Sequence, residues 1–334
     1  MNAKPISLLF STLALVLCGT GIALAAEGDS GRRGDFAKAG DACRFCDLRY
    51  EDLSTRDLSG VDLRGAFLHG ANLSWSALKN GRFSSANMVL VRMEWADLDG
   101  ADLSKAYLED AVMFRSTFRN ANFRQANLSR ANMSRSEMLG VNMVTAVMRG
   151  ADLSTARIAN AALRQADLTD VNLEGARLRE SDLQGALLDR ANLQGCDLTN
   201  SDLSGTSMKG ASLAATYIHL VNFRGANLSG ADFKNALIDA VNFGGANLSG
   251  ADLTGAVLRN SILIGANLCA TKMPDGSVGS CPVPPPPPPA AAAVAAPAGA
   301  APAAAEGQAA PADAQPTPGG VPPAPAGDPA QKAA

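Results

Sequence analysis

A five-residue hydrophobic period runs through most of this chain and limits what it can fold into. From Leu48 to Met273, 46 consecutive positions spaced five apart hold Leu, Phe, Met or Ile. We call each such residue a centre, and the residue two before it is nearly always Ala, Ser, Thr, Val or Cys. An α-helix or a single strand cannot bury this series on one face, because their periods are about 3.6 and 2.0 residues. A solenoid whose coil length is a multiple of five can bury every centre.

The individual units share a short motif. Typical ones are Ala231–Asn235, Ala246–Gly250 and Ala251–Gly255, which read ADFKN, ANLSG and ADLTG. This A(D/N)LXX pattern closely resembles the pentapeptide-repeat family over about 230 of the 334 residues. The resemblance implies an all-β fold, a right-handed quadrilateral β-helix in which four repeats form one coil and residues 20 apart stack.

The side chains of the repeat suit such a coil. Small residues two before each centre allow neighbouring coils to lie about 4.8 Å apart. With four repeats per coil, the 46 repeats would form about eleven coils and a stack roughly 55 Å long. Asp or Asn before the centre can bond nearby backbone groups in turns. Gly two after the centre, as at Gly225, Gly230 and Gly250, permits tight corners.

Large and sulfur-containing side chains at the centres invite a reading as a ligand pocket or copper site. All share the centre phase, so we expect core ladders instead, with Met filling irregular gaps. These residues are Phe223, Phe233, Phe243, Met133, Met138, Met143 and Met148.

The amino-terminal segment reads as an export signal. Lys4 precedes the apolar run Ile6 to Leu17, and Ala23-Leu24-Ala25 supplies small residues for cleavage. We therefore expect a signal peptide over residues 1–25, a linker over 26–42, and a periplasmic or secreted mature protein. An uncleaved membrane anchor is the alternative, although the apolar run is shorter than the roughly 20 residues of a span. No stable membrane span is expected after cleavage.

Four cysteines flank the repeat array, which we place at residues 43–273. Cys43 and Cys46 precede it in a CxxC arrangement, for which a structural disulfide, a redox dithiol and half of a metal site are open alternatives. A structural disulfide is favoured, because Asp47 stands where haem attachment needs His, and no βαβ context for a redox motif is present.

A turn and a proline-rich tail follow the array. Met273-Pro274-Asp275-Gly276 resembles the terminal turn of many exported pentapeptide-repeat proteins, and we expect a cap over residues 274–283 with a Cys269–Cys281 disulfide. Residues 284–334 begin with six prolines and continue mainly with Ala and Pro. A disordered tail is expected there, in part polyproline II, either as a spacer for a partner or as a solubilising segment.

Composition argues against catalysis and nucleic-acid binding. The chain has only two histidines, His69 and His219, so no Ser-His-Asp or Cys-His group can be proposed. Residues 43–273 hold 24 Lys and Arg against 24 Asp and Glu, which leaves neither the acidic rod of a DNA mimic nor a basic stripe. We expect no enzyme, no cofactor, no metal and no nucleic-acid partner.

One outward column stands apart from the others. If residues 20 apart stack, Trp75, Trp95, Arg115 and Arg135 follow one another on successive coils, with Phe114 beside Arg115. Exposed aromatic residues next to Arg are typical of surfaces that bind proteins or sugars. The alternative is that the rings only shield the first coils.

The sequence thus predicts a non-catalytic exported scaffold that binds a protein or glycan of the bacterial envelope. Two other functions stay open: a DNA mimic that protects a topoisomerase, and an envelope thiol oxidoreductase that uses Cys43 and Cys46.

Overall fold

The computed structural model describes residues 39–281. The predicted signal peptide, most of the linker and the tail over residues 284–334 lie outside the described residues.

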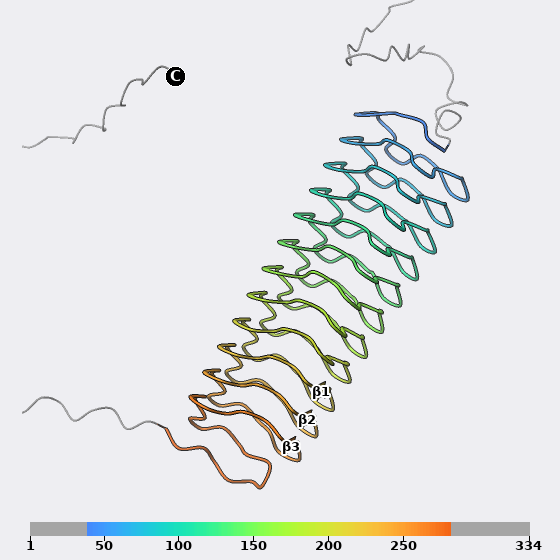
Figure 1. Ribbon diagram of the computed structural model, residues 1–334. Helices are drawn as coiled ribbons and strands as arrows, with labels where there is room; N and C mark the ends of the chain where they lie inside the picture. Colours follow the sequence, from blue (N-terminus) through green and yellow to red (C-terminus); the bar gives the residue numbers. More distant parts are fainter. Residues whose placement is uncertain (1–38, 282–334) are drawn as a thin grey trace, which may run out of the picture. The chain divides into compact units, whose positions relative to one another are not determined.

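Parallel pairing between residues 20 apart organises the described chain. β-Bridges join Ala42 to Asp62 at the amino-terminal end and continue in this register to the pair Asp252 and Lys272. Figure 1 shows the result, a regular stack of similar coils that runs from the blue to the orange part of the chain. The predicted 20-residue coil is confirmed, and the described residues contain strands and bridges but no helix.

Three bridges near the carboxyl-terminal end extend into strands, β1 (Tyr217–His219), β2 (Leu237–Asp239) and β3 (Val257–Arg259). They form one parallel sheet in the order β1-β2-β3, with Ile218 opposite Ile238 and Ile238 opposite Leu258. Elsewhere the pairing consists of single bridges, and a turn follows nearly every centre, with Ile158 as an exception.

The core consists of the centres and the small residues two before them. Every centre from Leu48 to Leu253 is buried, including the Phe and Met residues that the sequence assigns to core ladders. Neighbouring coils stack these side chains directly, as with Phe223 and Phe243, whose ring centroids are 5.4 Å apart. Only the last coil loosens, where Leu258, Leu263 and Leu268 are partly buried.

Each side of a coil ends in a sharp corner. At most corners the N–H of the residue three after a centre donates to the carbonyl of that centre, as from Val61 to Leu58 at 3.1 Å. The residue two after the centre has a positive φ, as at Gly225 and Gly230, both 67°. This geometry matches a type II turn and favours Gly. Non-glycine residues nevertheless occupy many corners, Trp75 (63°) and Leu90 (59°) among them. Each such corner costs about 1 kcal/mol of backbone strain.

Asp and Asn before the centre stabilise these turns, as the sequence predicts. The Ser54 N–H donates to Asp52 Oδ1 at 3.1 Å, and the amide of Asn72 on the next coil donates to the same oxygen at 3.0 Å. The Asp52 carboxylate therefore links the turn that follows it to the neighbouring coil.

The chain reverses direction after the last coil. Gly276 N–H donates to the Met273 carbonyl at 3.0 Å, and Val278 then forms an antiparallel bridge with Lys272. Lys272 also pairs with Asp252, so the returning segment takes the place that another coil would occupy. Solenoid ends expose unpaired edges that promote aggregation, and this segment covers part of one.

Candidate partner-binding surface

The candidate surface is built on one corner of the β-helix. Trp75, Trp95, Arg115 and Arg135 occupy the positive-φ position of four successive coils, with φ between 58° and 63°. We call this set the tryptophan–arginine column. The 20-residue register places each side chain above the next, and the rings of Trp75 and Trp95 stack with centroids 4.9 Å apart and planes 7° apart.

Phe114 contacts both the tryptophan part and the arginine part of the column. Its ring meets Trp95 edge-on at 6.2 Å. The Arg115 guanidinium lies 4.6 Å from the Trp95 centroid and 5.3 Å from that of Phe114, and Arg135 lies 5.7 Å from Phe114. Cation–π contacts of this kind contribute about 0.5–2 kcal/mol each. The rings therefore hold both guanidinium groups in defined positions.

Buried hydroxyl groups support the corner from beneath. Ser76 directly follows Trp75 and donates to the Leu53 carbonyl at 2.8 Å. Ser116 directly follows Arg115 and accepts from the Ala96 N–H at 3.2 Å. These bonds cross between coils, so they fix the backbone from which the column projects.

The column remains accessible despite its internal stacking. Trp75 is 60% exposed and Trp95 is 40% exposed. Within residues 39–281, neither Arg115 nor Arg135 forms a salt bridge, whereas Arg130 and Arg190 each pair with an Asp on the neighbouring coil. The surface thus offers flat aromatic area together with two positive charges that no carboxylate of the described chain neutralises. Sugars, or carboxylates of a protein, would complement it.

Four cysteines lie at the ends of the array, two at each end. The structure brings Cys43 and Cys46 into a disulfide with a Cα–Cα distance of 5.5 Å, and Cys269 and Cys281 into another at 4.0 Å. Cys196 is the remaining cysteine of the described chain, and it donates to the Leu173 carbonyl. Burial raises the pKa of its thiol to about 12, so this group is protonated and unreactive.

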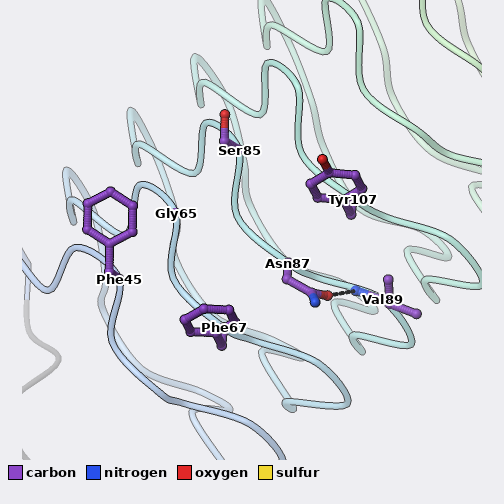
Figure 2. A pocket seen from close by; sticks show the side chains of 7 residues that line it. All are labelled: Phe45, Gly65, Phe67, Ser85, Asn87, Val89 and Tyr107. Carbon is purple, nitrogen blue, oxygen red and sulfur yellow. Dashed lines mark hydrogen bonds between the residues drawn. The ribbon is translucent and has the colours of Figure 1, made fainter.

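A second exposed aromatic surface was not predicted from the sequence. It is a shallow hollow of about 420 Å³ on another side of the first coils (Figure 2). We call it the aromatic hollow, and it is lined by Phe45, Gly65, Phe67, Ser85, Asn87, Val89 and Tyr107. The available signal was a break in the motif, because Phe67 and Tyr107 stand directly before a centre, where Asp or Asn is usual.

Within the described ranges, no cluster of three or more His, Cys, Asp or Glu could hold a metal ion. In the same part of the chain, no helix is long and apolar enough to cross a bilayer.

Comparisons with known proteins match repeats and no catalytic family. One family model, described as a pentapeptide repeat region, matches residues 111–188. A second, described as pentapeptide repeats (8 copies), matches overlapping segments within residues 43–113 and 176–273. The search of curated proteins gave no match.

Solved structures of repeat proteins are also similar to the chain. HetL, a pentapeptide repeat protein involved in heterocyst differentiation regulation in the cyanobacterium Nostoc sp. strain PCC 7120, is 28% identical, with 71% of this chain and 92% of that chain covered and a TM-score of 0.41. QnrB1, a plasmid-mediated fluoroquinolone resistance protein, is 18% identical, with 67% and 92% covered and a TM-score of 0.36. A thylakoid lumen pentapeptide repeat protein of Arabidopsis thaliana is 25% identical, with 36% and 66% covered and a TM-score of 0.17.

Proposed function

Because this chain belongs to the pentapeptide-repeat family, we propose that it is a non-catalytic scaffold that binds a protein or glycan partner of the bacterial envelope. The scaffold is a right-handed quadrilateral β-helix of about eleven coils. The tryptophan–arginine column is its binding face. The observation that supports this role most directly is the stack of two exposed indole rings continued by two arginines that lack a carboxylate partner among the described residues.

Rigidity makes such a column effective. Its side chains project from corners that are fixed by backbone bonds to both neighbouring coils. At Trp75 the N–H donates to the Glu94 carbonyl at 2.9 Å, and the adjacent Ser74 carbonyl accepts from the Thr55 N–H of the preceding coil at 3.0 Å. Because the rings and guanidinium groups are already ordered before binding, less conformational entropy is lost on association. Two or three buried aromatic or Arg contacts can dominate the affinity of such a surface.

The amino-terminal sequence supports export as part of this proposal. The apolar run Ile6 to Leu17 and the small residues Ala23 and Ala25 support cleavage after residue 25 and a periplasmic or secreted mature protein. An oxidising compartment would also maintain the disulfides Cys43–Cys46 and Cys269–Cys281 as structural links at the two ends.

The test compares capture of partners by wild type and by a Trp75→Ala, Trp95→Ala double variant. We expect the double variant to fold normally and to lose binding to envelope proteins and polysaccharides that the wild type retains. Tyr217→Ala is the matched control, because Tyr217 is 42% exposed and lies six bridged steps beyond Asp97, outside the tryptophan–arginine column. Equal capture by all three proteins would refute the role of the column.

Two alternative functions have their own tests. A DNA mimic needs sustained negative potential, and carboxylates of this array are often paired with a cation, as in Arg130–Asp110 and Arg190–Asp170. Mature protein found in the cytoplasmic fraction would favour that alternative.

A thiol oxidoreductase would reduce insulin, and Cys43→Ser would abolish this activity.

A further inference from the structure

The aromatic hollow is independent of the tryptophan–arginine column and has a different chemistry. Its rings are exposed, with Phe45 at 61%, Phe67 at 46% and Tyr107 at 53%. None of its seven lining residues carries a charge. A hollow of this composition suits an apolar, uncharged ligand rather than an acidic or basic peptide.

The two rings on the floor of the hollow have a defined spacing. Phe67 pairs with Asn87, and Asn87 pairs with Tyr107, so the rings occupy the same position two coils apart (Figure 2). At about 4.8 Å per coil, this separation along the stack is about 9.6 Å. A polyproline II helix has three residues per turn and a rise of 3.1 Å, so it presents one residue to the same side about every 9.3 Å. A polyproline strand parallel to the stack would therefore place successive turns on Phe67 and Tyr107.

The polar groups of the hollow complement the backbone of such a strand. Proline has no N–H, so a polyproline strand offers only carbonyl acceptors. Asn87 uses Oδ1 to accept the Val89 N–H at 3.3 Å, which leaves its Nδ2 as a donor. No residue of the described chain accepts from this Nδ2 or from the Tyr107 hydroxyl. Two donors thus lie among the rings where the carbonyls of the strand would run.

The chain itself contains the matching ligand. Pro284 to Pro289 are six consecutive prolines, enough for two polyproline turns. This run cannot reach the hollow of its own molecule, because even Pro289 follows Cys281 by only eight residues, which span at most about 29 Å. Asn267 lies close to the Cys269–Cys281 link. Eight bridged steps of about 4.8 Å separate Tyr107 from Asn267, so the two residues are about 38 Å apart along the stack.

We propose that the aromatic hollow is a docking groove for polyproline, and that its occupant is the proline run 284–289 of a second copy of this chain. Phe67 and Tyr107 stack on successive proline turns, Phe45 closes the amino-terminal end, and Asn87 donates to a carbonyl between the two rings.

The first experiment measures the groove directly. A fluorescein-labelled peptide of residues 283–290 is titrated, with fluorescence anisotropy as readout, into the full chain in which Pro284 to Pro289 are each replaced by Ser. This replacement removes competition from the protein's own run. We expect saturable binding that Phe67→Ala with Tyr107→Ala weakens at least about tenfold. A peptide with Ala in place of the prolines should not bind.

Leu187→Ala is the matched control. Leu187 occupies the same position in the repeat as Phe67 and Tyr107, is 44% exposed, and lies four coils beyond Tyr107. It should leave peptide binding unchanged, and circular dichroism should show that all variants are folded. Absence of peptide binding, or equal binding by the Phe67→Ala, Tyr107→Ala variant, would overturn the groove assignment.

The second experiment identifies the occupant. Sedimentation velocity of the wild type over a range of concentrations should show reversible association, which disappears in the serine-substituted variant and in Tyr107→Ala. If the peptide binds but the wild-type chain stays monomeric well above the measured Kd, the occupant is a foreign proline-rich segment and the second-copy proposal fails.

Discussion

The amino-terminal and carboxyl-terminal coils share one backbone but differ in their surfaces. The first coils carry Phe45, Phe67, Trp75, Trp95 and Tyr107 as exposed rings. Many later corners carry glycine instead, with open space around Gly205, Gly225 and Gly245. Because the buried centres continue through both regions, this contrast does not arise from folding requirements. Both proposed binding surfaces lie on the first coils, so under these proposals the later coils mainly supply length.

The largest expected effect is a loss of stability when a buried centre is replaced by a charged residue. It tests whether the centres form one continuous core through both regions. Leu168→Asp places a charge at a centre that is 2% exposed, without a partner, and should lower the free energy of unfolding by at least about 3–5 kcal/mol. Leu187→Asp makes the same change at a position where Asp is common, and should be nearly neutral. Thermal unfolding by circular dichroism measures both. A folded, unperturbed Leu168→Asp protein would contradict the assignment of centres.

The two ends should respond differently to loss of their disulfides. Cys281→Ser opens a 12-residue separation and should destabilise the last coil by about 3 kcal/mol, whereas Cys43→Ser opens a separation of three residues and should cost about 2 kcal/mol. Hydrogen exchange resolved by coil is the measurement. Leu258, Leu263 and Leu268 are only partly buried, so exchange should spread from that end. Equal protection of the last coil with and without Cys281 would show that the link is not structural.

A pair of glycines on one corner separates ring packing from backbone strain. A methyl group on Gly65 would lie 2.4 Å from Phe45 Cε1, whereas one on Gly225, at the same corner eight coils later, would meet no atom within 4 Å. Both alanine variants should lose about 1 kcal/mol from the positive φ. Only Gly65→Ala should also displace the Phe45 ring and weaken binding of the proline peptide. Equal peptide binding by both variants would remove Phe45 from the groove.

The smallest expected effect concerns acid. Hydrogen bonds from Arg64, and secondarily from Arg44, hold the pKa of Asp62 well below its usual range. A lowered folded-state pKa stabilises the fold above the unfolded pKa of about 3.9, and this contribution is lost as the pH falls below about 4. It should be less than about 1 kcal/mol, because both arginines are solvent-exposed. The difference in Tm between wild type and Asp62→Asn should therefore be present at pH 6 and shrink near pH 3. A constant difference would contradict this linkage.

The sequence was sufficient to predict the buried positions because this signal is local, and each centre identifies its own inward position. The 20-residue register came from the resemblance to the pentapeptide-repeat family, and it then places Trp75 over Trp95. The corners could be predicted only in part. Gly225 and Gly250 indicate a turn, but the sequence does not show that Leu90 or Trp75 would adopt the same positive φ. Regular pairing on both sides imposes that geometry on side chains that disfavour it.

The aromatic hollow could not be predicted by following single columns. Phe45 belongs to a corner, whereas Phe67 and Tyr107 belong to the position before a centre, and they converge only when the corner and the flat side are placed together. The gap at Gly65 that accommodates the Phe45 ring is likewise a relation between two coils. Properties of this kind depend on side-chain orientation, which the repeat period does not specify.

The register of 20 residues also governs how such a protein can change by insertion or deletion. Removing four whole quintets from the middle would shorten the stack by one coil, and each residue would still stack on a residue from the same side of the neighbouring coil. Removing a single quintet would instead turn everything downstream by one side, so that residues formerly on one flank of the helix would face another. The number of quintets between two surfaces therefore sets both their separation along the helix axis and their relative rotation about it. Insertion or deletion of quintets can rotate one surface relative to another while the core is still built from the same kinds of residue.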